Sequence, residues 1–323
     1  MNLPRNLTRT TFAVAGLAAA AWLAVALLLG WRELAAALAR CGPGLFALVA
    51  LLSLANYGLR YLRWQAFLRT VGARVPPRTS FAVYFASYVM VITPGKLGEV
   101  FKAAILRDRT GLPLAKGLPV VLAERIYDFL AVLALVAVGM VFWDGPWHGS
   151  RAALAAGTLF GALLLAVRSS ALRRRLVARA AGSRHLAGHT VGLDEALAAT
   201  SDLLAPGPGL GHLAVSTGAW FCECAGLWLV CRVLAPGVDL PAAVFVYAAA
   251  TLVGSVSFLP GGLGGTEAVI IVLLGSLAVP GPAAAAVAFI VRLATLWLAV
   301  VVGLAVFAAC RGAIVGPAPG GRR

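Results

Sequence analysis

Long apolar stretches separated by short polar connections make up most of this chain. An α-helix of about 20 apolar residues is long enough to cross the hydrocarbon core of a bilayer. Six stretches approach or exceed that length, namely residues 11–30, 45–68, 117–142, 152–168, 209–235 and 283–310. Two further apolar regions, residues 79–106 and 241–279, are interrupted by proline and glycine. The pattern predicts an all-α polytopic membrane protein with about six full spans and two re-entrant or broken helical hairpins.

Composition and charge agree with a membrane protein. The 323 residues are 61% hydrophobic and 12% charged, with a mean hydropathy of +0.92. The net charge of +15 would suit a nucleic-acid binder, but the basic residues lie at predicted helix ends and in one connection, about residues 168–206. Such residues gather in the cytoplasmic loops of membrane proteins. We therefore expect a basic cytoplasmic loop, cytoplasmic termini, the cell (cytoplasmic) membrane as location, membrane lipids as partners and no nucleic acid.

The two interrupted regions resemble each other in sequence. Both contain Pro-Gly-x-Leu-Gly followed by a glutamate and an apolar helical stretch. An arginine follows at a matched distance, because Pro94 precedes Arg125 by 31 residues and Pro260 precedes Arg292 by 32. The two segments are ITPGKLGEVFKAAIL, residues 92–106, and FLPGGLGGTEAVIIVLL, residues 258–274.

An inverted-topology repeat follows from this similarity. With the basic residues in the cytoplasm, the first hairpin enters from the cytoplasmic side and the second from outside. The sequence predicts a single transmembrane domain, residues 1–323, with repeat halves of about 10–143 and 151–311. Inverted repeats are common in secondary transporters, whose substrate site lies where the broken helices meet. The alternative is a compositional match, since proline and glycine are frequent in membrane helices.

Charged residues inside the predicted spans need an explanation, because each costs on the order of 2.5–3.5 kcal/mol at the bilayer centre. They must pair, line a watery cavity or reach the interface. Arg125 and Asp128 are one helical turn apart and can pair. Arg60 and Arg63 could instead extend to the cytoplasmic surface. The full set is Asn56, Arg60, Arg63, Lys96, Glu99, Lys102, Glu124, Arg125, Asp128, Glu223, Glu267 and Arg292.

The Pro-Gly motifs favour an anion site. Glycine lets the backbone approach a ligand closely, and a helix that begins after such a turn directs free N–H groups at the site. The candidate substrate-binding residues are Lys96, Arg125, Arg292, Arg60, Gly95, Gly261 and Gly262. The candidate gating or coupling residues are Glu99, Glu124, Asp128 and Glu267. Structural ion pairs are the alternative for each charged member, and we expect no metal site and no cofactor.

Five segments together are similar to a known family. In order they read NYGLRYLRW, TPGKLGEVFKAAIL, AERIYDF, LPGGLGGTEA and VRLATLW, within about residues 50–310. They resemble the lysylphosphatidylglycerol synthase transmembrane-region family, the flippase-like part of bacterial multiple-peptide-resistance-factor proteins. The resemblance implies a multi-pass membrane protein that moves anionic or lipid-linked headgroups. By resemblance, the motif positions are Lys96, Glu99, Glu124, Arg125, Asp128, Glu267 and Arg292.

The expected function is therefore lipid transport of the flippase type. The chain departs from the full-length synthases by ending at Arg323 without a soluble aminoacyl-transfer domain, which disfavours lysyl-lipid synthesis. The sequence contains no G-x-x-x-x-G-K-[ST] loop for ATP. We expect a transporter rather than an enzyme, with an anionic phospholipid or a polyprenyl-phosphate-linked lipid as substrate. The alternatives are a membrane-embedded transferase that uses a lipid-phosphate donor and a small-solute secondary transporter.

Overall fold

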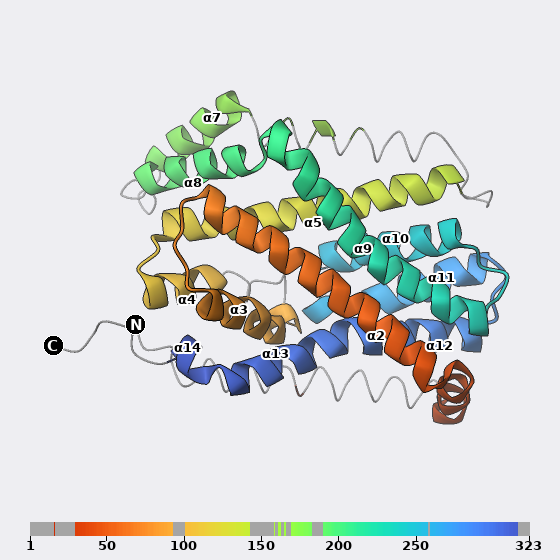
Figure 1. The fold of residues 1–323 in the computed structure, drawn as a ribbon. Coiled ribbons are helices and arrows are strands. Elements are labelled where there is room, and N and C mark those ends of the chain that lie inside the picture. Colours follow the sequence, from red (N-terminus) through yellow and green to blue (C-terminus); the bar gives the residue numbers. More distant parts are fainter. Residues whose placement is uncertain are drawn as a thin grey trace.

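The structure is a computed structural model in which every described element is a helix (Figure 1). It describes residues 30–92, 101–142, 169–182, 190–257 and 259–315, with isolated positions 16, 158, 161, 162 and 165. Four helices in these ranges are long and apolar enough to cross a membrane. The fold is therefore that of an all-helical multi-pass membrane protein.

The four long helices account for four of the six predicted spans. Helix α2 (Trp31–Thr70) bends at Gly42, α5 is Leu114–Phe142, and α9 is Pro206–Leu234. The fourth consists of α12 (Gly281–Arg292), the π-helical segment η5 (Leu293–Trp297) and α13 (Leu298–Ala309). The other two predicted spans, residues 11–30 and 152–168, fall outside the described ranges apart from isolated positions. The total of six spans therefore stays a prediction.

The two interrupted regions form short helices. The first comprises α3 (Pro77–Ala86), η1 (Ser87–Ile92) and α4 (Phe101–Thr110). The second comprises α10 (Leu240–Val256), η4 (Pro260–Gly262) and α11 (Gly265–Ser276), with α10 packed against α11. At 1.5 Å per residue, the 17 residues of α10 rise about 25 Å and the 12 of α11 about 18 Å. Neither is long enough to cross about 30 Å of hydrocarbon alone.

The break between α10 and α11 has a local cause. Gly261 and Gly262 adopt φ values of 61° and 66°, in the left-handed region that side chains with a Cβ rarely enter. Beyond them, the Glu267 Oε2 atom accepts a hydrogen bond of 2.8 Å from the Gly264 N–H and so satisfies a free donor at the start of α11. The Pro-Gly motif therefore ends one helix and starts another.

The basic connection is more ordered than the sequence analysis predicted. It contains α7 (Ser170–Ala181) and α8 (Thr190–Leu203), which pack against each other, and α8 also packs against α5. The Ser169 hydroxyl accepts a hydrogen bond from the Leu172 N–H at the start of α7. The hydrophobic periodicity does not predict these helices, because their polar faces interrupt the apolar pattern. The short helix α14 (Arg311–Val315) ends the described chain.

Elements of one predicted half pack against elements of the other. Helix α2 packs along α9, α5 packs against α10, and α13 packs against α3 and η1. Figure 1 places α3 and α4 toward one end of the long helices and α10 and α11 toward the other. Between them, Ile92 at the end of η1 packs against Gly261 and Leu296. Ile92, two residues before Pro94 of the first Pro-Gly motif, therefore contacts the second motif in the interior.

The predicted topology can be tested with single cysteines at Thr110 and Pro280. Thr110 ends α4 and Pro280 precedes α12, at opposite ends of the long helices (Figure 1). We expect a membrane-impermeant maleimide to label Thr110→Cys only from the cytoplasmic side and Pro280→Cys only from outside. The five native cysteines must first be replaced, because Cys222 and Cys310 are partly exposed. Labelling of both positions from one side would contradict the topology.

Candidate functional site

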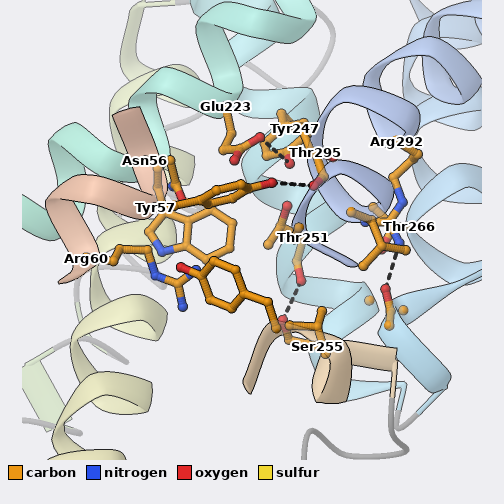
Figure 2. A pocket seen from close by; sticks show the side chains of 18 of the residues that line it. Asn56, Tyr57, Arg60, Glu223, Tyr247, Thr251, Ser255, Thr266, Arg292 and Thr295 are labelled. Carbon is orange, nitrogen blue, oxygen red and sulfur yellow. Dashed lines mark hydrogen bonds between the residues drawn. The ribbon is translucent and has the colours of Figure 1, made fainter. Parts of the chain in front are cut away.

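A polar cavity lies among α2, α9, the hairpin of α10 and α11, and the η5 segment. Figure 2 shows Asn56, Tyr57 and Arg60 reaching it from α2, with Thr251, Thr266 and Arg292 across from them. The cavity has a volume of about 100 Å³, counted as the space that the centre of a water molecule can occupy. One water needs roughly 10–15 Å³ by this measure, so the cavity has room for a small polar headgroup.

Three arginines converge on one aspartate at the edge of this cavity. Asp128 on α5 forms ion pairs with Arg60 at 2.7 Å, Arg63 at 2.8 Å and Arg125 at 2.9 Å. Arg60 also lies over the Trp220 ring, with 5.4 Å from its Cζ atom to the ring centroid. These four residues by themselves bring three positive charges and one negative charge to the same place.

Arg63 is fully buried rather than extended to the membrane surface. Its side chain is 0% exposed. Besides Asp128, it donates hydrogen bonds to the Ser216 hydroxyl and, at 3.4 Å, to the Glu124 carbonyl. The alternative in which Arg63 reaches the cytoplasmic surface is therefore wrong. Arg60 likewise points inward and is only 11% exposed in its side chain.

A second buried pair supports the same region. The Lys102 ammonium on α4 contacts the Glu124 carboxylate on α5 at 2.8 Å, and both side chains are at most 2% exposed. The ammonium also lies 5.2 Å from the Trp64 ring centroid and 5.1 Å from that of Tyr84, within cation–π range. Glu124, predicted as a gating or coupling residue, therefore lies behind the cavity wall and holds α4 against α5.

Arg292 is fixed on the opposite side by the second Pro-Gly motif. Its Nε atom contacts the Glu267 carboxylate at 2.8 Å, and one of its terminal nitrogens donates a 2.6 Å hydrogen bond to the Gly261 carbonyl. Arg292, Gly261 and Gly262 all line the cavity. The matched spacing of proline and arginine in the sequence thus corresponds to a direct contact in this half.

Glu223 is a further cavity residue. The Ser53 hydroxyl and the Tyr247 hydroxyl each donate to its Oε2 atom at 3.3 Å. Nearby, Tyr57 donates a hydrogen bond to the Thr295 carbonyl in the π-helical segment (Figure 2). Sequence reasoning noted Glu223 as an isolated charge but did not place it in the site. Its missed neighbours are hydroxyl-bearing and aromatic residues, which are common in membrane helices and give no signal by themselves.

The predicted site residues separate into three groups. Arg60, Arg125, Arg292, Gly261 and Gly262 line the cavity. Asp128 and Glu267 bind those arginines, whereas Glu124 binds Lys102. Lys96, Gly95 and Glu99 lie outside the described residues. The roles assigned to all of them in substrate binding and coupling stay predictions.

A second cavity adjoins the first between α5, α9 and α10. The two share Arg125, Trp220, Thr251 and Ser255. The remaining wall of the second cavity is largely apolar and consists of Phe129, Val132 and Leu252, together with Asp128. A polar chamber and a mainly apolar chamber therefore meet at Arg125 and Trp220.

The cluster around Asp128 predicts a large effect on stability. Asp128→Asn would leave the three arginines without their shared anion, and removal of one partner from a buried ion pair costs about 3–5 kcal/mol. We expect a markedly lower apparent unfolding temperature in detergent. Asp202→Asn, on the exposed surface of α8, is the matched control and should change stability by less than about 0.5 kcal/mol. Equal stability of Asp128→Asn and the wild type would disprove this role.

Comparison with known proteins agrees with the resemblance found in the sequence. A UPF0104 membrane protein of Methanothermobacter thermautotrophicus is 25% identical over 314 residues, covering 87% of this chain and 90% of that protein. A second UPF0104 membrane protein of that organism is 33% identical over 92 residues, covering 28% of this chain and 27% of its own length. Glycosyltransferase AglD of Haloferax volcanii is 27% identical over 142 residues, 42% of this chain but only 22% of AglD.

The family assignment extends over most of the chain. Residues 12–303 match the lysylphosphatidylglycerol synthase TM region. This range contains both Pro-Gly motifs, all four long helices except the last residues of α13, and every described residue of the polar cavity. The chain therefore belongs to the lysylphosphatidylglycerol synthase TM region family of multi-pass membrane proteins.

Proposed function

We propose that this protein moves a lipid with an anionic headgroup across the cell membrane by alternating access. The substrate is an anionic phospholipid or a polyprenyl-phosphate-linked lipid. The observation that carries the proposal is the set of three arginines, Arg60, Arg125 and Arg292, on the wall of one cavity inside a membrane protein. Charges at such a depth are expensive and mark substrate pathways.

Phosphate chemistry fits this wall. A guanidinium group offers planar N–H donors that match the oxygens of a phosphate, often two at a time. Asp128 and Glu267 hold the arginines in place. Asp128 is shared by Arg60, Arg125 and the buried Arg63, and in this proposal an anionic headgroup brings further negative charge to these arginines. In this proposal Lys96 and the backbone at Gly95, Gly261 and Gly262 complete the headgroup site, and Glu99 takes part in gating or coupling.

The adjoining cavity favours a lipid over a small solute. Phe129, Val132 and Leu252 offer an apolar surface to a hydrocarbon chain, and Arg125 lies where the two cavities meet. A headgroup in the polar chamber would therefore leave its chain in the apolar one. A small polar solute would not need the apolar surface of the second cavity.

The packing of the helices supports alternating access. The contact between α5 and α10 is matched by that of α13 with α3 and η1, as expected if the two halves are inverted copies. Two broken helices that meet at the midplane are typical of transporters whose halves rock around a fixed site. In that movement the contact of Ile92 with Gly261 would be part of the boundary between the halves.

A second candidate function is transfer of a group from a lipid-phosphate donor. The similarity to part of glycosyltransferase AglD favours it. By residue type, the candidate general bases are Glu99, Glu124 and Asp128. Glu99 lies outside the described residues, whereas Glu124 is engaged by Lys102 and Asp128 by three arginines. Transport is the better-supported candidate.

Leaflet exchange of a labelled lipid tests the headgroup site. In proteoliposomes, we expect Arg125→Ala to slow exchange by about tenfold or more, because a hydrogen bond to a charged group contributes about 1.5–3 kcal/mol. Arg107→Ala, which affects an exposed pair with Asp108, is the control and should exchange like the wild type. Formation of a transferred product without leaflet exchange would favour the transferase instead.

The chain cavity can be blocked without changing a charge. Val132→Trp would fill part of the apolar chamber, because Val132 is buried and lines it. We expect slower exchange of a long-chain lipid and little change in binding of a water-soluble headgroup analogue, measured by calorimetry. Val138→Trp lies on the exposed side of the same helix and is the matched control. If Val132→Trp weakened binding of the headgroup analogue as much as it slowed lipid exchange, the result would argue against a separate site for the lipid chain.

A further inference from the structure

Glu223 differs from the other carboxylates in or beside the described core. Asp128, Glu124 and Glu267 each contact a basic side chain at 2.7–2.9 Å. Glu223 is just as inaccessible, with 4% exposure, yet within the described ranges its direct partners are two neutral hydroxyls. A buried carboxylate that lacks an ion pair is costly in its charged form. Glu223 is therefore the described carboxylate best suited to take up and release a proton.

The surroundings of Glu223 link its charge to the contents of the cavity. Its hydroxyl donors both bind Oε2, which leaves Oε1 to carry a proton. Arg60 and Arg292 line the same cavity as Glu223, but each is engaged by another carboxylate. Besides Glu223, the titratable and charged groups that line this cavity are Tyr57 and Arg60 from α2, Tyr88 from η1, Arg125 from α5, Tyr247 from α10 and Arg292 from α12. Asp128 lines the adjoining cavity, and Cys222 and Cys224 flank Glu223 on α9.

From this arrangement we infer that Glu223 is a proton-binding site that couples proton movement to transport of the anionic headgroup. This inference rests on the proposed function. A phosphate in the cavity would place a second negative charge near Glu223 and compete with it for Arg60 and Arg292. Both effects favour the neutral carboxylic acid. Binding of the anionic headgroup and binding of the proton therefore strengthen each other.

The coupled cycle moves one proton with each headgroup. On the loading side, Glu223 takes a proton from water, an O–H bond forms at the carboxyl group, and its charge changes from −1 to zero. After the halves rock, the headgroup leaves, the arginines again favour the carboxylate, and the proton passes to water on the other side. The protein returns to its starting state, and the proton and the anionic headgroup have moved in the same direction.

The test is the pH dependence of leaflet exchange in proteoliposomes. The probes are NBD-labelled phosphatidylglycerol and an NBD-labelled polyprenyl phosphate, with dithionite to quench the label in the outer leaflet. The two probes distinguish the two lipid sources of a phosphate headgroup. For the wild type, we expect exchange of the accepted probe to rise about fivefold or more between pH 8 and pH 6, within the usual range of coupling between two sites. A pH gradient should also enrich the probe in one leaflet.

Variants at Glu223 separate coupling from structure. Glu223→Gln mimics the neutral acid, so exchange should be independent of pH and a pH gradient should produce no enrichment. Glu223→Asp should restore a pH response. Glu195→Gln removes an exposed carboxylate on α8 and should keep the wild-type profile. A Glu223→Gln protein that retains the wild-type pH response and enrichment would overturn the inference.

A variant that keeps the Glu223 carboxylate tests the inference even if the Glu223→Gln protein misfolds. Tyr247→Phe removes one hydroxyl that stabilises the charged form, so the rise in exchange should begin at higher pH than in the wild type. An unchanged midpoint in a folded Tyr247→Phe protein would count against the inference. Wild-type exchange that does not respond to pH would also overturn it while leaving lipid transport intact. Absence of exchange for both probes would instead contradict the proposed function itself.

Discussion

Asp128 holds three guanidinium groups in the interior of the helical bundle, those of Arg60, Arg63 and Arg125. Each arginine would be prohibitively costly in hydrocarbon without such a partner. The interaction connects α2 to α5, and Arg63 extends it to α9 through Ser216. The positions of three long helices therefore depend on one carboxylate. In the proposed function, the arginines that join these helices also attract the anionic headgroup.

The second Pro-Gly motif contributes the other side of the cavity through its backbone. The turn at Gly261 and Gly262 ends α10, and its carbonyl at Gly261 accepts a hydrogen bond from Arg292. Glu267 both binds Arg292 and accepts a hydrogen bond from the Gly264 N–H, just before α11. A proline-glycine turn, a helix start and a basic side chain thus form a single structural unit. Its contact with Ile92 joins it to the other broken helix of the proposed transporter.

The carboxylates of the described core fall into two groups, those that contact a basic side chain and one that does not, and the two groups suit different roles. Asp128, Glu124 and Glu267 are anchored by cations and hold helices together. Within the described residues, Glu223 accepts hydrogen bonds from two hydroxyls, those of Ser53 and Tyr247, and it faces the cavity. In our proposal, arginines held by carboxylates bind the headgroup and Glu223 carries an exchangeable proton. Transport would then draw energy from a proton gradient. The adjoining apolar chamber explains how the lipid chain could be accommodated.

The sequence by itself determined the all-helical membrane class, the family and the break at the second Pro-Gly motif. Hydrophobic length and that motif are local properties, and they correctly indicated the four long helices and the turn at Gly261, whereas the first motif lies outside the described residues. The one-turn spacing of Arg125 and Asp128 also indicated their ion pair. Only the tertiary structure decided which distant charges meet. Arg63 binds Asp128, Lys102 binds Glu124, and Glu223 remains with Ser53 and Tyr247. Hydrophobic periodicity indicates which face of a helix a residue occupies. The partner of that face depends on how the helices pack, because a charge can be neutralised by any neighbour that packing brings within about 3 Å.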